Sequence, residues 1–139
     1  MSMIENVRYL GIEIKKSSFE RFEIESEGGT YGLEATTATV NIHVAEEGSD
    51  ESVTFFSIPV NAKVWGEDKQ TKEKVFVCDA YFEVDFALEE RDELADDAIA
   101  NMLDSNEWYF RNFVAISVKT ALESVLKNTS FSSIEIPLK

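Results

Sequence analysis

Apolar and polar residues alternate along several stretches in the first two thirds of the chain, and this period of two is typical of strands that bury one face. The clearest case is the stretch in which Phe82, Val84 and Phe86 alternate with Tyr81, Glu83 and Asp85. Short turns separate the later stretches, so we expect an antiparallel meander. The pattern predicts four strands, near 7–16, 35–46, 53–66 and 74–88.

Two features interrupt this strand pattern. Pro59 lies inside the third predicted strand, and because it cannot donate a backbone hydrogen bond it predicts an edge position or a bulge. Residues 17–34 form a looser stretch with several glycines between the first and second strands. We therefore expect a long loop over 17–34.

The period changes to that of helices in the last third of the chain. Leu94, Ala98 and Met102 recur at helical spacing and predict a short amphipathic helix. The sequence of residues 104–107 is typical of a helix cap, and the following residues to about 127 contain no Gly or Pro, so a long helix is expected near 107–127. The result is an α+β fold in a single domain, 1–139, that ends in an alternating apolar tail.

The charge of the chain excludes several classes of partner. The 139 residues include 27 acidic and 13 basic side chains, for a net charge of −14. Phosphate backbones and anionic membrane surfaces repel such a chain, so we expect no nucleic-acid partner. No apolar run approaches the ~20 residues of a membrane helix, so no membrane insertion is expected. The single cysteine excludes an intramolecular disulfide, which together with the lack of an apolar leader favours a cytoplasmic location.

Little in the sequence indicates catalysis. His43 is the one histidine, which excludes a catalytic pair of histidines, and Cys78 lacks a nucleophile signature and is interpreted as a buried structural thiol. The acidic run over 89–97 lacks the glycine and the ligand alternation of a calcium loop, so it is interpreted as a solvated helix face. We expect no enzyme activity, no metal and no cofactor.

Aromatic residues are more informative. The chain has 10 Phe, 4 Tyr and 2 Trp, more than one buried sheet face needs. Such residues either form a peripheral core or offer an interaction surface, and the sequence does not distinguish the two. A surface of this size favours a homo-oligomer or a protein partner. The aromatics in question are Phe19, Phe22, Tyr31, Trp65, Tyr81 and Trp108.

The order of the elements and three local motifs resemble the SecB family of bacterial export chaperones. The first motif is Lys-Lys-Ser-Ser-Phe-Glu at 15–20, after the first strand. The second is Val-Phe-Val-Cys-Asp at 75–79, which opens the fourth strand. The third is Tyr-Phe-Arg at 109–111, which opens a long helix followed by Thr-Ser-Phe at 129–131 and the apolar tail 134–138.

The resemblance implies a four-stranded antiparallel sheet, with a crossover loop after the first strand, packed against a short and a long C-terminal helix. It also implies an ATP-independent holdase, a homo-dimer or homo-tetramer that binds unfolded or export-bound polypeptides in apolar grooves. The alternative is a SecB-like adaptor or assembly protein dedicated to one partner, for example an antitoxin, without general chaperone activity. A hot-dog-type enzyme is disfavoured because its central helix follows the first strand, whereas here the long helix comes last.

The resemblance also assigns site residues. In the family the crossover loop borders the client groove, which places the client-binding residues at Phe19, Phe22, Ile24, Tyr31 and Leu33. Contact with the motor ATPase SecA is assigned to Glu20, Val77 and Asp79. Lys16 stands where the family has another acid, and the family's cationic C-terminal extension has no counterpart in the printed sequence. Both departures weaken the case for SecA binding.

Overall fold

The computed structural model describes residues 3–23, 28–43, 53–89 and 98–137. After a short 3-10 helix, η1 (Met3–Asn6), the strands are β1 (Val7–Arg21), β2 (Gly29–Thr37), β3 (Asn41–His43), β4 (Val53–Asp68) and β5 (Lys74–Glu89). Two helices follow, α1 (Ala98–Ser105) and α2 (Glu107–Leu126). The predicted α+β class is confirmed.

The strands form one antiparallel sheet in the order β1-β5-β4-β2, and β3 pairs with the same edge of β4 as β2 does. The chain therefore crosses from one edge of the sheet at β1 to the other edge at β2. The long strands β4 and β5 lie in the middle and pair over most of their length. This is the predicted meander with a crossover after the first strand.

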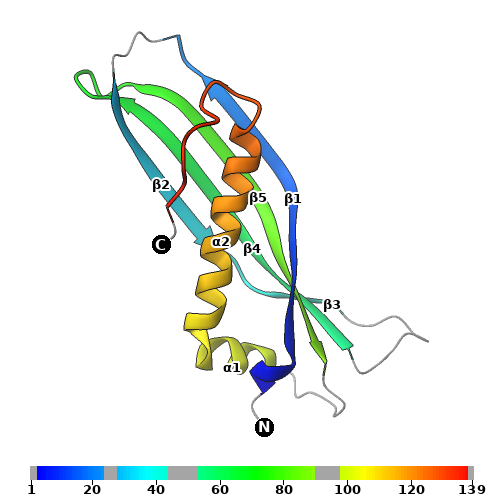
Figure 1. Ribbon diagram of the computed structural model, residues 1–139. Coiled ribbons are helices and arrows are strands. Elements are labelled where there is room, and N and C mark those ends of the chain that lie inside the picture. The colour runs from blue at the N-terminus through cyan, green and yellow to red at the C-terminus, as the bar shows by residue number, and fades with distance from the viewer. Residues whose placement is uncertain (1–2, 24–27, 44–52, 90–97, 138–139) are drawn as a thin grey trace.

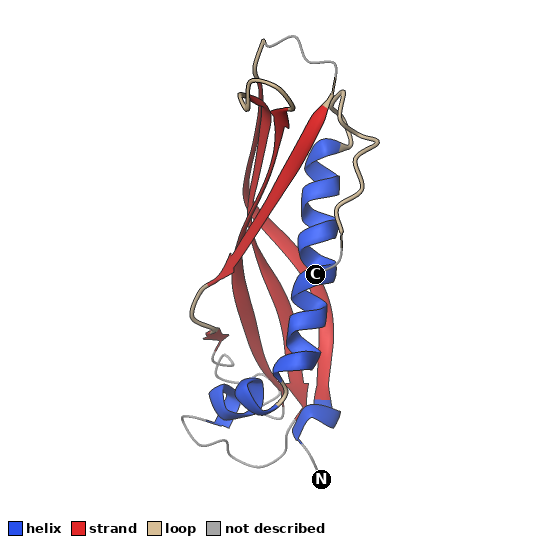
Figure 2. Cartoon of the chain, turned by 90° about the vertical axis from the view of Figure 1, so that its left-hand side faces the viewer, coloured by secondary structure: helices blue, strands red, loops and turns tan. Residues whose placement is uncertain are grey.

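The protein has two layers. Helix α2 lies along one face of the twisted sheet, and the described part of the chain leaves the opposite face bare (Figures 1 and 2). Alternate residues of β4 and β5 point toward α2, as the period of two predicted. They pack with Phe110, Val118 and Leu122 of α2 to form the core. The largest fully buried side chains of the two strands are Phe56, Val60, Val64, Phe82, Val84, Phe86 and Leu88.

Two strand boundaries differ from the prediction. The stretch 17–34 is not one long loop, since β1 continues to Arg21 and β2 already begins at Gly29. The sequence signal failed because these segments lie at the two edges of the sheet and bury little on either face, so their alternation is weak. The predicted strand 35–46 is divided into the end of β2 and the short β3, and residues 44–46 lie outside the described residues.

Pro59 lies in an interior strand and not at an edge or in a bulge. Its carbonyl accepts a hydrogen bond from the backbone N–H of Ala38 at 3.0 Å, so its backbone polar side faces the β2–β3 edge. At that point β2 has ended opposite Val60 and β3 begins opposite Ser57. The missing N–H therefore falls in the gap between two short strands and removes no ladder hydrogen bond.

The junction of the two helices also differs from the prediction. Asn106 precedes α2, but its side chain makes no capping bond to that helix. Its amide Nδ2 donates instead to the carbonyl of Met102 in α1 at 2.9 Å, while its own carbonyl accepts from the N–H of Tyr109. Asn106 thus closes the C-terminal end of α1 and turns the chain into α2.

Candidate functional site

The bare face of the sheet carries the residues that the resemblance assigned to a motor contact. Glu20 of β1 pairs in register with Val77 of β5, and Val77 pairs in turn with Trp65 of β4. Asp79 lies two residues further along β5 and so points to the same face. The three assigned residues therefore lie together, with Trp65 as an additional apolar neighbour.

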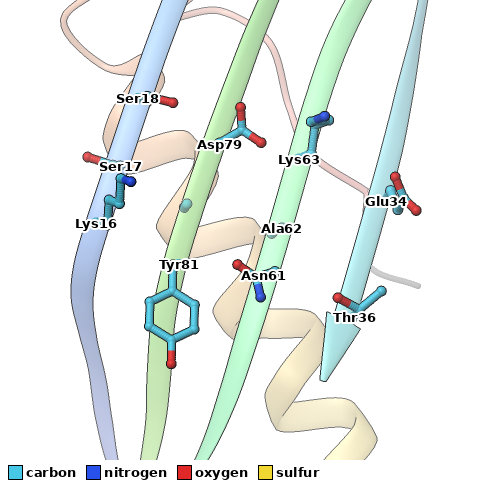
Figure 3. A pocket seen from close by; sticks show the side chains of 11 residues that line it. Lys16, Ser17, Ser18, Glu34, Thr36, Asn61, Ala62, Lys63, Asp79 and Tyr81 are labelled. Atoms are coloured by element: carbon cyan, nitrogen blue, oxygen red, sulfur yellow. The ribbon is translucent and has the colours of Figure 1, made fainter. Parts of the chain in front are cut away.

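A hollow of about 460 Å³ lies beside this group on the bare face (Figure 3). Lys63 lies between Glu34 of β2 and Asp79 of β5, its register partners on the two neighbouring strands. Lys16 and Tyr81 close the side nearer β1. The hollow is polar and carries both charges, so it is suited to a polar protein surface and not to an apolar chain.

Two further hollows lie at the two ends of β2, and the lower one runs along the edge of α2 that faces β2. The lower hollow, nearer α1, measures about 410 Å³ and is bordered by Val40, Leu103 and Val114, with Phe110 and Ile58 at its base. Charged side chains stand at its rim, and they belong to Asp104, Glu107 and Arg111. An apolar floor with a charged rim can hold an apolar side chain of a polypeptide while the flanking backbone stays in water.

The upper hollow lies at the opposite end of β2 and measures about 210 Å³. It is lined by Tyr31, Val75, Phe76 and Ile134. Gly66 of β4 also lines this hollow. Any other residue at this position would place its Cβ 2.6 Å from Cε1 of Phe76, so the glycine allows the Phe76 ring to lie against β4. Tyr31 and Phe76 of the upper hollow, like Ile58 of the lower one, lie on the face of the sheet that carries α2.

The C-terminal segment runs back along α2 (Figure 1), and its Ile134 lines the upper hollow. Phe131 stacks on Phe76 with ring centroids 4.2 Å apart and anchors the segment near the end of β1. Beyond it, Ile136 is 1% exposed. Lys119 donates to the carbonyl of Ile136 at 2.9 Å, and Glu123 accepts from the N–H of Ile136 at 3.2 Å. The hydrogen bond from Lys119 holds the pKa of the Glu123 carboxyl below its usual range.

The residues predicted to bind clients are divided by the structure. Phe19 is a residue of β1 that packs on Phe76 and Phe131, and Tyr31 and Leu33 belong to β2, so the assignment of these three to a loop is wrong. Phe22 is half-buried and its N–H donates to the carbonyl of Val75 at 2.8 Å. Ile24 lies outside the described residues. Of the described four, Tyr31 lines the upper hollow.

Cys78 is buried in the core, as predicted. Burial, with the neighbouring Asp79 carboxylate, raises the pKa of this thiol to about 11. A thiol with such a pKa is protonated at neutral pH and is a poor nucleophile. Within 3–23, 28–43, 53–89 and 98–137, no three metal-ligating side chains converge. Most of the acidic run over 89–97 lies outside these ranges. The described helices include none that is long and apolar enough to cross a membrane.

Comparison with solved structures identifies the architecture. The structure superposes on the SecB-like chaperone Rv1957 of Mycobacterium tuberculosis, solved in complex with a ChAD peptide from the Rv1956 HigA1 antitoxin. The TM-score is 0.65 at 13% sequence identity, and the alignment covers 99% of this chain and 94% of that chain. The chain has a SecB-like fold. The fold indicated by the three sequence motifs is thereby confirmed.

Other comparisons add little to the SecB-like assignment. No protein-family model and no curated protein matches the sequence. A protein of unknown function from Streptococcus agalactiae aligns over 96% of both chains at 13% identity, but its TM-score of 0.38 is too low to indicate a shared fold.

Sequence reasoning missed the residues that border the lower hollow of this SecB-like fold and the contacts of the C-terminal segment. Val40 and Val114 are distant in sequence, and only the packing of α2 against the β2–β3 edge brings them together. The sequence contains a partial indication of the contacts made by Ile136. Lys119 and Glu123 are four residues apart on one helix, the spacing of a helical ion pair.

Proposed function

We propose that this protein is an ATP-independent holdase that binds unfolded or partly folded polypeptides along the edge of α2. The observation that carries the proposal is the pair of hollows at the two ends of β2, the lower of them against α2, on a SecB-like fold. An unfolded chain presents mixed segments, so a general holdase needs apolar contacts with little hydrogen-bond selectivity. The lower hollow, with Phe110 and Ile58 at its base, offers such contacts.

The charge of the protein supports the same function. At −14 per chain, a loaded complex repels other complexes, which opposes aggregation, and cationic clients are attracted. Exposed aromatic rings supply contact area at low cost in side-chain entropy. Tyr31, 48% exposed, is such a ring at the upper hollow.

The proposed holdase works as a homo-oligomer in the cytoplasm and without catalysis. Two features support oligomerisation: β1 is a 15-residue edge strand, and α2 exposes Trp108 and Ile116 on its outer side. A strand edge of this length with an apolar helix face is normally covered by another chain. Cys78 is buried and protonated at neutral pH, which supports a non-catalytic role, and a single free cysteine fits a reducing compartment.

A second function keeps the fold and the groove but narrows the client. The SecB-like chaperone Rv1957 was solved with a peptide from an antitoxin, which supports a dedicated adaptor as the alternative. A dedicated adaptor would bind one cognate segment tightly and leave unrelated unfolded proteins to aggregate.

The bare face of the sheet supports a further contact, with a motor ATPase of the SecA type. Glu20, Val77 and Asp79 lie side by side there, and Trp65 extends the apolar part of the patch. Lys16 and Lys63 lie on the same face and reduce its acidity. If the motor presents a basic surface, the charge reversal Lys16→Glu should strengthen binding and Glu20→Lys should weaken it.

An aggregation-suppression assay with several unrelated clients tests the proposal. A holdase should suppress light scattering of at least several unfolded proteins at near-stoichiometric ratios, with no effect of ATP. Suppression of one client alone would favour the adaptor. A folded, oligomeric protein that suppresses none and binds no unfolded chain would refute both.

A further inference from the structure

Lys119 and Glu123 contact the main chain of Ile136. Nζ of Lys119 donates to the Ile136 carbonyl at 2.9 Å and to Oε1 of Glu123 at 2.8 Å. The same Oε1 accepts from the N–H of Ile136 at 3.2 Å. Both backbone polar groups of one residue are thus satisfied by two side chains of α2, while its aliphatic side chain is buried beneath them.

This arrangement is independent of the sequence of the bound segment. Every residue except proline carries one N–H and one carbonyl, so any extended segment can make the same two bonds. Selection comes only from the buried position, which accepts an aliphatic side chain. Such a site recognises the backbone of a polypeptide together with one apolar side chain. Unrelated unfolded polypeptides all offer these two features.

Apart from these contacts of Ile136, the segment is attached through Ile134, which packs against the core. Residues 134–137 have no regular secondary structure. The backbone–backbone hydrogen bonds of residues 132–137 are local: the N–H of Ser132 donates to Thr129 and that of Ile134 to Phe131. In the part of the chain that the structure describes, 132–137 therefore pairs with no strand. We call 132–137 the strap.

The strap covers the part of α2 that follows the lower hollow. Along β2, Tyr31 lines the upper hollow and Thr37 the lower one. Along α2, Val114 lines the lower hollow, and Lys119 and Glu123 follow within the next three turns. The C-terminal segment runs back along α2 on the side nearer β2 (Figure 1). Release of the strap would uncover Lys119 and Glu123 on α2 and would remove Ile134 from the wall of the upper hollow.

We propose that Lys119 and Glu123 form a main-chain clamp for extended polypeptide segments with an aliphatic side chain, and that the strap is its resident occupant, which a client displaces. The inference rests on the proposed holdase function and identifies a binding site within it. The clamp holds the strap when no client is present and so keeps an apolar groove covered. A client that binds both hollows gains contacts that the short strap cannot make.

The test compares client binding by wild type and by Ile136→Ser, which weakens the strap and leaves the clamp intact. The probe is a fluorescently labelled, permanently unfolded protein with blocked cysteines, followed by anisotropy. Because a competing occupant reduces the binding-competent fraction, Ile136→Ser should lower the apparent Kd by about threefold or more. The matched control is Glu135→Ser, an exposed position in the same strap, which should leave Kd unchanged. Adding Lys119→Met to Ile136→Ser should remove the gain.

Amide hydrogen exchange on the wild-type chain gives a second readout that needs no variant. Addition of the unfolded probe should speed exchange of the Ile136 N–H. If wild type binds the probe but Ile136→Ser has the same Kd and the Ile136 amide stays protected, the clamp is wrong and the holdase function stands. If neither chain binds the probe, the holdase function itself fails.

Discussion

Gly32 of β2 lies directly beneath the indole ring of Trp65 on the bare face of the sheet. A Cβ at position 32 would lie 2.3 Å from Cζ2 of Trp65, too close for any side chain to fit without moving the ring. The indole Nε1 donates to Glu67 at 3.1 Å, and Lys74 lies 5.7 Å from the ring centroid. The glycine therefore allows a broad aromatic surface to lie flat beside Val77.

Gly32→Ala should displace this indole ring. Because the ring is only half-buried and can rotate outward, we expect a loss of about 1–2 kcal/mol in the free energy of unfolding. Urea unfolding in a Trp108→Phe background, where Trp65 is the single reporter, should show the loss together with a red-shifted emission. Thr36→Ala, an exposed position on the same strand, is the control. Unchanged emission would mean that the ring does not lie over position 32.

The protein should be a homo-oligomer at micromolar concentration. The unpaired edge of β1 and the outer side of α2, where Trp108 is 65% exposed and Ile116 is 45% exposed, are the surfaces available to a second copy. Multi-angle light scattering should give a mass at least twice 15.7 kDa. A Trp108→Ser, Ile116→Ser variant should dissociate at least one interface. A monomer of 15.7 kDa would contradict this prediction.

Tyr31 and Leu33 should respond differently to truncation, although both lie on the helix side of β2. Leu33 packs against the core, so Leu33→Ser should lower the free energy of unfolding by roughly 2–3 kcal/mol. Tyr31 is half-exposed at the upper hollow, so Tyr31→Ser should weaken client binding while the melting temperature changes little. Thermal melts and binding titrations on the same samples check this. Equal losses of stability in both variants would show that Tyr31 is a core residue.

The contact between Glu123 and Ile136 should be lost in acid. The pKa of Glu123 in the folded chain lies below its ordinary value of 4.5, chiefly because Lys119 donates to its carboxylate. The stabilisation of the fold by the Glu123 carboxylate is therefore fully present above pH 4.5. It disappears as the pH falls through the lowered pKa of this group. The Ile136 amide proton should shift in NMR spectra recorded between about pH 6 and about pH 3, and Glu123→Gln should abolish the transition. A shift that persists in Glu123→Gln would assign the titration to another group.

Cys78 should resist alkylation until the protein unfolds. Burial raises its pKa from an ordinary 9.0 to about 11, so the native thiol is protonated at neutral pH as well as inaccessible. The unfolded chain loses this proton at a lower pH than the folded chain, so stability should decrease as the pH rises from 9.0 toward about 11. Iodoacetamide labelling with and without urea measures the first effect. Rapid labelling of the native protein would show that β5 opens locally.

The sequence by itself determined the class of fold and its central elements. The alternation along β4 and β5 is strong because these interior strands bury one face against α2 and leave the other bare. The long helix was equally visible, since residues 108–127 lack glycine and proline and carry a continuous apolar stripe. The predicted burial of Cys78 followed from its place in that alternation. These features depend on local periodicity, which a sequence displays directly.

Only the tertiary structure decided where the edges and grooves lie. β1 beyond residue 16 and β2 before residue 35 bury little, so their sequences lack the alternation that would have marked them as strands. Pro59 predicts an edge position or a bulge. The structure accommodates it instead in the gap between β2 and β3, which both pair with β4. The contacts of Ile136 with Lys119 and Glu123 required the chain to fold back along α2. Such sites form between segments distant in sequence, and no local pattern encodes which segments will meet.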